Sequence, residues 1–441
     1  MVLSPTPFSL LCAVLLCLPL AIVFTIITPT STSTSSSAGD SLSSVVPASS
    51  NPKNTTGATF RIENKVKNSS LEKTIPRPSI INVNHTNMTP KHNITTNIIN
   101  TTTQSPPPQP PPEDDADDEE LFRLASRVSS KPLPNSAPKR LAFLFLTTSP
   151  LPFAPLWELF FNETARPLNQ TAPYASSPPP SLFNVYIHAD PSFNYSPPFT
   201  GIFSGKVIPS SKPTRRFSPS LIAAARRLLA HALLDDSSNY MFALLSASCI
   251  PLHSFHFTYE TLIHSRKSFI EILKNEIYTY SRWVARGEHV MLPEVPLDHF
   301  RIGSQFFVLT RKHARVVVRD RRLWGKFKLP CVRWDTCYPE ENYFPTLLSM
   351  RDLGGCVPAT LTHVDWKGRH DGHPRTYVGS EVGPELIMTL RSDKIRYGDD
   401  RTNGSDLARK ERMYPFLFAR KFAPDSLQPL MSIANDIIFK D

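Results

Sequence analysis

Apolar residues gather in short runs after residue 139 and predict an alternation of strands and helices. Residues 141–146 and 183–187 are short, largely apolar runs that end in polar residues, and residues 241–245 form a third. Runs of this kind are typical of strands that are buried on both faces of a sheet. Residues 205–208 predict a further, shorter strand.

The clearest helical pattern lies just before the third of these strands. Ser218 suits an N-cap and Pro219 the first helical position, and the pattern stops at the polar residues 235–237. Apolar residues recur at helical spacing between these ends: Leu221, Ile222, Ala225, Leu228, Leu229, Ala232 and Leu233. A shorter helix is predicted over residues 155–161.

The second half of the chain is less regular. It predicts strands over residues 304–309 and 361–366 and helices over residues 312–319, 384–390 and 426–439. The alternation predicts an α/β fold with a mainly parallel central sheet, whose ligand lies at the carboxyl ends of the strands. Asp190 lies at one such end. No Gly-rich phosphate loop is present, which argues against a dinucleotide-binding domain or a P-loop.

Residues 331–350 carry the most suggestive chemistry, the carboxylate pair Glu340 and Glu341. Pro339 fits the start of a helix in which Pro345 would occupy the first turn. The backbone dipole stabilises an ionised carboxylate there, and such a carboxylate can act as a general base toward a hydroxyl group. Acids in a first helical turn are also ordinary helix-start residues, so this pattern alone leaves both interpretations open.

The amino-terminal part predicts a membrane anchor followed by an extended stem. Residues 8–27 are an uncharged apolar run of 20 residues, long enough to span the roughly 30 Å hydrocarbon core of a bilayer. We expect an uncleaved signal anchor after a cytosolic tail of residues 1–7; a cleaved signal peptide is the alternative.

Residues 28–138 are rich in Ser, Thr, Asn and Pro and predict a disordered stem. An acidic run at 113–120 includes Asp115-Ala116-Asp117, which in a disordered tether would not hold a metal. Glycosylation signals cluster here and predict a lumenal location. The acceptor residues in the stem are Asn54, Asn68, Asn84, Asn87, Asn93 and Asn100, and the downstream region adds Asn162, Asn169, Asn194 and Asn403.

Charge and cysteine content add two constraints. The formal charge of +10 suits polyanionic surroundings such as acidic glycans, and no nucleic-acid-binding motif accompanies it. Cys249, Cys331, Cys337 and Cys356 lie in the predicted globular part, where an oxidising lumen favours one or two disulfides near Glu341. Their ligand spacing does not support zinc, and the pairing is left open.

Several segments together carry a resemblance to a known family. The sequence resembles the core-2/I-branching β-1,6-N-acetylglucosaminyltransferase-like family, in particular its plant branch, once described only as a domain of unknown function. The resemblance covers about residues 139–438. The segments that carry it, in chain order, are VYIHAD (185–190), ARRLLAHALLD (225–235), FALLSASCIPLHSF (242–255), RIGSQFFVLTRKHA (301–314), CYPEENYFPTLL (337–348), THVDW (362–366), GHPRTY (372–377) and FLFARKF (416–422).

This resemblance implies a lumenal domain over residues 139–441 with a GT-A-type nucleotide-sugar-binding fold. It implies an inverting glycosyltransferase that needs no metal or other cofactor. Glu341 would be the catalytic base, with Glu340 in support. Arg375, Lys421 and Asp190 would bind the UDP-sugar donor, with Thr147 or Thr148 beside the nucleotide. The acceptor side would contain Arg282 and Trp283.

The resemblance also implies location and substrates. We expect a single-pass type II protein of the Golgi membrane whose catalytic domain is lumenal. It would transfer N-acetylglucosamine, glucuronic acid or a similar sugar to a glycan or glycoprotein, with a role in cell-wall or arabinogalactan synthesis. The alternative is a catalytically inactive lumenal glycan-binding or scaffold protein with the same fold.

Overall fold

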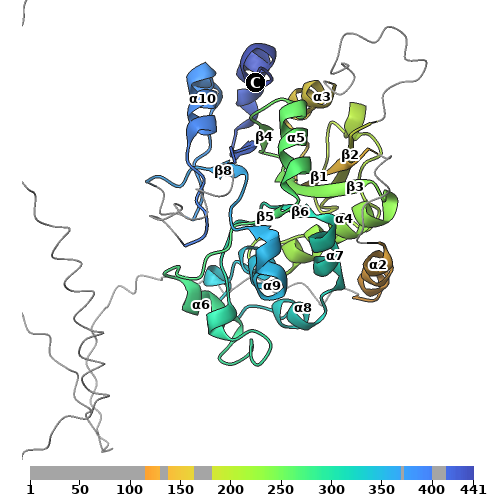
Figure 1. Ribbon diagram of the computed structural model, residues 1–441, viewed down its shortest axis with the longest axis vertical. Helices are drawn as coiled ribbons and strands as arrows, with labels where there is room; N and C mark the ends of the chain where they lie inside the picture. Colours follow the sequence, from red (N-terminus) through yellow and green to blue (C-terminus); the bar gives the residue numbers. More distant parts are fainter. Residues whose placement is uncertain (1–114, 130–137, 163–180, 369–371, 400–413) are drawn as a thin grey trace, which may run out of the picture. The chain divides into compact units, whose positions relative to one another are not determined.

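The computed structural model describes residues 115–129, 138–162, 181–368, 372–399 and 414–441 (Figure 1). The predicted anchor at residues 8–27 and most of the predicted stem lie outside these ranges. Within them, no helix combines the length and apolar character needed to cross a membrane.

A six-stranded mixed sheet forms the centre of the domain. β1 (Arg140–Thr147) runs parallel to β2 (Phe183–Ala189) on one side and to β3 (Asn239–Ser246) on the other. These three strands confirm the predictions at residues 141–146, 183–187 and 241–245. The sheet continues through β6 (Val308–Thr310), which is antiparallel to its neighbours, then β5 (Ser268–Phe269) and β7 (Cys356–Val357).

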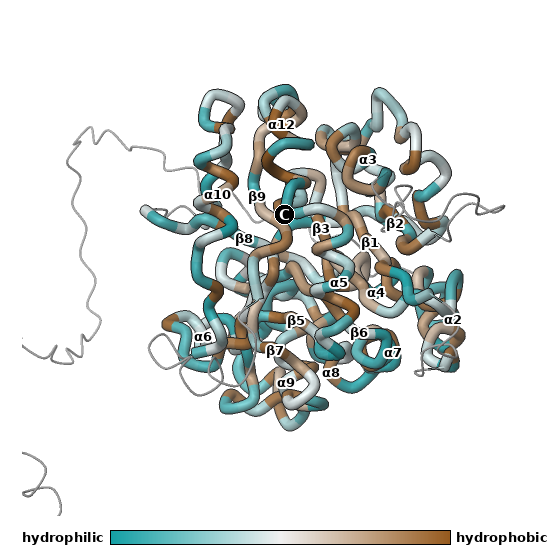
Figure 2. Tube along the Cα trace, turned by 45° about the horizontal axis from the view of Figure 1, so that its top comes forward, coloured by the Kyte–Doolittle hydropathy of each residue, from teal (hydrophilic) through white to brown (hydrophobic). Residues whose placement is uncertain are grey.

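Alternating side chains of β1 pack into two apolar cores. Phe143 and Phe145 face the core that contains residues of α3 (Ala154–Asn162) and α5 (Phe255–Ser265). Ala142 and Leu144 face the other core. The helices on that side are α4 (Ser220–Asp235), α7 (Arg311–Arg319), α8 (Arg322–Phe327) and α9 (Tyr343–Asp352). Figure 2 shows the resulting pattern, with apolar colouring along β1 and hydrophilic colouring on the outer helix α7.

A second, three-stranded sheet lies toward the carboxyl terminus. Its strands, in spatial order, are β4 (Ile250–Pro251), β9 (Phe418–Arg420) and β8 (Thr362–Val364). The predicted carboxyl-terminal helix appears as α12 (Leu427–Ile433), continued by a π-helical turn, and the predicted helix at 384–390 appears as α10 (Pro384–Ser392).

The strand predicted at residues 205–208 is only a single bridge between Val207 and Ile187. The amide of Ile187 donates to Lys206 O, and the amide of Ile208 donates to Ile187 O, both at 2.8 Å. Pro209 follows directly and has no amide to continue the ladder. The pairing therefore stops at the edge of β2.

The acidic run corrects the predicted stem boundary. Residues that we assigned to a disordered stem form α2 (Asp115–Arg127), which packs against α4 and α7. Asp118 accepts hydrogen bonds from Arg227 at 2.8 and 2.6 Å, and Phe122 and Ala125 are buried. The prediction was wrong here because the acidic run supplies the countercharge for a buried arginine on α4. The Asp-Ala-Asp sequence is thus helical, and residues two apart on a helix do not face each other.

Candidate active site

Glu341 lies at the end of a 3₁₀ turn (Pro339–Glu341) that leads directly into α9. Pro345 is the third residue of α9, so it occupies the first turn as the sequence predicts. The amide of Gly303 donates to the Glu341 carbonyl at 2.8 Å. The main chain at Glu341 is therefore fixed by a neighbouring segment as well as by its own turn.

The carboxylate of Glu341 is paired with Arg282 and remains partly open to solvent. Arg282 belongs to the short helix α6 (Thr279–Trp283), and its Nη1 donates to Glu341 Oε2 at 2.7 Å. The relative solvent exposure of the Glu341 side chain is 29%. The Arg282 guanidinium also lies 4.6 Å from the ring centre of Tyr338. This arrangement orients a carboxylate that a ligand can still reach.

A disulfide joins Cys331 to Cys337 in the loop that precedes the carboxylate pair. It packs on Ala285. Only Val284 separates Ala285 from the end of α6. Cys249 and Cys356 are buried free thiols. The cysteine pairing that the sequence left open is thus one short bridge, and it ties the Glu341 loop to the segment that carries Arg282.

Glu340 differs sharply from its neighbour. Its side chain is buried, and burial raises its pKa to about 8, with the Glu341 charge acting in the same direction. The sequence predicted that the backbone dipole stabilises an ionised carboxylate at this position, but for Glu340 burial has the larger effect. Its carboxyl group faces the protein interior, where the charged form is disfavoured.

This pKa predicts a pH-dependent stability. The folded-state pKa of Glu340, about 8, exceeds the ordinary 4.5. The protonated group therefore contributes stability that is complete below about pH 4.5 and is lost as the pH rises through 8, by up to about 1.4 kcal/mol per pH unit. We expect Glu340→Gln to flatten this decline in urea unfolding between pH 5 and 9. An identical slope in both proteins would contradict the assignment.

Gly303 permits a close approach that the site requires. A Cβ at this position would lie 2.0 Å from the carbonyl oxygen of Glu271. The Gly303 amide also donates a hydrogen bond to the Glu341 carbonyl. We expect Gly303→Ala to lower the free energy of unfolding by about 1–3 kcal/mol and to reduce turnover, because the Glu341 segment must shift. The matched control is Gly325→Ala on α8, where nothing lies within 4 Å. Equal thermal midpoints for the two variants would refute this explanation.

The segments that carry Arg375 and Lys421 run side by side. The amide of Tyr377 donates to Lys421 O at 2.9 Å, and the amide of Lys421 donates to Arg375 O at 3.4 Å. The structure thus brings together the main chains of the two predicted donor-binding residues. The Arg375 side chain pairs with Glu381 and lies 3.8 Å from Asp365, so a bound anion would have to compete with these carboxylates.

Two observations place the segments of this basic pair near Glu341. A Cβ on Gly372, three residues before Arg375, would lie 3.4 Å from the hydroxyl of Tyr338. Arg420 directly precedes Lys421; burial lowers its pKa, and the Glu341 charge is one of those that oppose this shift. The predicted base and the predicted donor cations therefore belong to one region of the domain.

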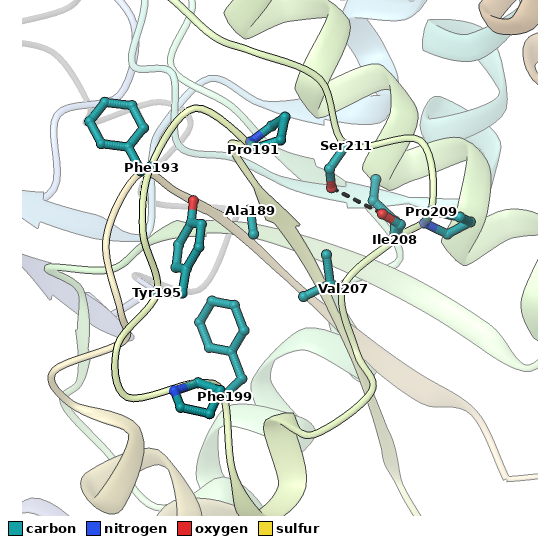
Figure 3. Close-up of a pocket in the computed structure, with 10 residues that line it drawn as sticks. Ala189, Pro191, Phe193, Tyr195, Phe199, Val207, Ile208, Pro209 and Ser211 are labelled. Atoms are coloured by element: carbon teal, nitrogen blue, oxygen red, sulfur yellow. Dashed lines mark hydrogen bonds between the residues drawn. The ribbon is translucent and has the colours of Figure 1, made fainter.

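Asp190 organises the loop that follows β2. It is buried, and its carboxylate accepts hydrogen bonds from the amide of Ser192 and from both the amide and the hydroxyl of Thr214. Tyr195 of the same loop donates to the carbonyls of Asp190 and Thr147, and Figure 3 shows it in the wall of a shallow apolar pocket. Direct contact between Asp190 and the donor remains a prediction.

Trp283 has a different role from the one expected. Its side chain is buried in the apolar core that contains Ala142 and Leu144, and its Nε1 donates to Val295 O at 2.8 Å. The structure gives it a packing role in place of the predicted acceptor contact. Asn162 is exposed at the end of α3, as a glycosylation site must be; Asn169 and the six stem signals lie outside the described residues.

Sequence reasoning missed one acid of this region. Burial raises the pKa of Glu271 to about 7; Arg396 acts against this shift, and Glu276 and Glu341 add to it. Glu271 lies two residues after the end of β5. Its signal was a single acid inside the apolar run 269–273, which is too short to establish a strand.

A mixed α/β domain with a mainly parallel central sheet and this site fits a GT-A-like fold, the fold of nucleotide-sugar transferases. A family model described as Core-2/I-Branching enzyme matches residues 141–391. Glycosyltransferase BC10 of Oryza sativa subsp. japonica is 31% identical over 328 residues, which cover 67% of this chain and 77% of the relative. The chain belongs to the core-2/I-branching family and is a glycosyltransferase.

Proposed function

We propose that the protein transfers a sugar, with inversion, from a UDP-sugar to a hydroxyl group of a glycan or glycoprotein. The observation that carries this proposal is the partly exposed Glu341 carboxylate, oriented by Arg282 at 2.7 Å. A general base must reach the acceptor hydroxyl within hydrogen-bond distance. An oriented but accessible carboxylate meets that requirement.

The reaction balances with these residues alone. Glu341 takes the acceptor proton as the acceptor oxygen bonds to the anomeric carbon, and the bond from that carbon to the UDP oxygen breaks on the opposite face. Arg375 and Lys421 stabilise the charge that develops on the diphosphate. On this proposal the two cations do the work that a divalent metal does in other transferases. Within the described ranges, no three His, Cys, Asp or Glu side chains are grouped as metal ligands.

We also propose a location in the cell. Residues 8–27 anchor the protein in the Golgi membrane as a type II protein, and the catalytic domain lies in the lumen. The donor sugar is N-acetylglucosamine, glucuronic acid or a similar unit, and the product belongs to the cell wall or to arabinogalactan. The formal charge of +10 suits acidic glycans. The competing possibility is an inactive glycan-binding protein with the same fold.

A panel of UDP-sugars distinguishes the two possibilities. The true donor should raise the thermal midpoint of the folded protein by mass action, and it should release UDP when an acceptor is added. An inactive glycan-binding protein would respond to glycans but would release UDP from no donor. Stabilisation by no UDP-sugar, together with no UDP release, would reject the proposed function.

A further inference from the structure

Three large side chains lie exposed beside the entrance to α6. Ile277 is 91% exposed, Tyr278 65% and Tyr280 57%. They lie within four positions of one another at the start of α6, a segment hereafter called the α6 corner. Exposed apolar groups that lie together mark binding surfaces more often than single ones do.

The surrounding protein holds the segment that carries this corner. Asp399 accepts hydrogen bonds from the amides of Lys274 and Asn275 at 2.9–3.0 Å. Glu276 pairs with Arg396 at 2.6 Å. The exposed rings are therefore carried by an anchored turn, which reduces the conformational entropy lost when a ligand binds.

The α6 corner continues directly into the candidate active site. The amide of Arg282 donates to Tyr278 O at 3.0 Å, and residues four apart share one face of a helix. Tyr278 therefore lies about one turn, roughly 6 Å along the axis, from the arginine that holds Glu341. A substrate with its reacting hydroxyl at Glu341 and its remaining length along α6 would pass Tyr278.

We propose that Tyr278 forms an outer acceptor subsite that binds the sugar units next to the one that reacts. This inference rests on the proposed function and narrows the acceptor to an oligosaccharide or a longer glycan. Tyrosine suits such a ligand because its ring covers the apolar C–H face of a sugar while its hydroxyl reaches a neighbouring hydroxyl. Continuity with the Glu341 site favours an acceptor glycan over a partner protein.

The test compares acceptors of different length on the full chain. The probes are galactose, xylose and N-acetylglucosamine oligosaccharides of one to six units, used with whichever UDP-sugar proves to be the donor. We expect Tyr278→Ala to raise KM about 10-fold for acceptors of three or more units, about 1.4 kcal/mol. Its kcat, its KM for single sugars and its UDP release into water should be unchanged.

A control variant and a second measurement make the result decisive. Met388→Ala, at a side chain 56% exposed on α10, should change no KM, and Tyr278→Trp should preserve binding because it keeps a ring. Equal KM values in wild type and Tyr278→Ala at every length would overturn the proposal.

Calorimetric titration with the same oligosaccharides separates this inference from the proposed function. Binding that Tyr278→Ala weakens about 10-fold, without transfer from any donor, would support the subsite and reject the enzymatic role. Wild-type protein that binds none of these sugars would overturn the subsite.

Discussion

Replacing Glu341 with Gln is expected to reduce kcat by about 10²–10⁴-fold, the usual contribution of a general base. The amide oxygen can still accept the hydrogen bond that Arg282 donates at 2.7 Å, so the site should keep its geometry. The amide cannot take the acceptor proton. UDP should therefore stabilise the variant as it stabilises the wild type, while single-turnover sugar transfer slows.

Glu340→Gln is the matched control for this experiment. Glu340 is adjacent in sequence, but with a pKa of about 8 it is already largely protonated at pH 7. Its replacement by an uncharged amide of the same size should keep transfer within a few-fold of wild type. Wild-type turnover in Glu341→Gln, or an equal loss in both variants, would contradict the assignment of Glu341 as the base.

Asp118→Asn is expected to cost about 3–5 kcal/mol of the free energy of unfolding, because it leaves a buried charge without its partner. The Arg227 side chain is 0% exposed and lies 2.6 Å from Asp118. A domain is stable by only about 5–15 kcal/mol in total, so the urea midpoint of the variant should fall steeply. The same contact predicts that a chain beginning at residue 139 folds poorly, whereas one beginning at residue 113 folds.

The control for Asp118 is Glu120→Gln on the same helix. Glu120 pairs with Arg123 on the solvent side of α2, where ion pairs contribute little. This variant should unfold at nearly the wild-type midpoint. If a chain from residue 139 is as stable as one from residue 113, then α2 is not part of the catalytic domain.

The sequence predicted the long elements of the fold and missed the short ones. The three central strands and α4 were visible because each has enough residues to show a largely apolar run or a helical stripe. β5 and β7 have two residues each, which is too few for any periodicity. Their existence depends on pairing with β6 and with each other, which only the folded chain provides.

The sequence likewise predicted some features of the candidate site and of its surroundings and missed others. The resemblance indicated Glu341, Arg375 and Lys421, and the structure brings their segments into one region. It could not reveal that Trp283 turns into the core, or that Asp118 pairs with an arginine 109 positions away. Such contacts are invisible to a pattern because nothing local in either segment specifies its partner.

UDP release from the preferred UDP-sugar and acceptor, measured in EDTA and again with Mn²⁺, tests whether fixed cations take the place of a metal. The proposed mechanism predicts equal wild-type rates under both conditions. It also predicts a loss of about 10²–10³-fold in Arg375→Ala/Lys421→Ala, the usual effect of removing a group that stabilises developing charge. Wild-type activity that disappears in EDTA and returns with Mn²⁺ would contradict it.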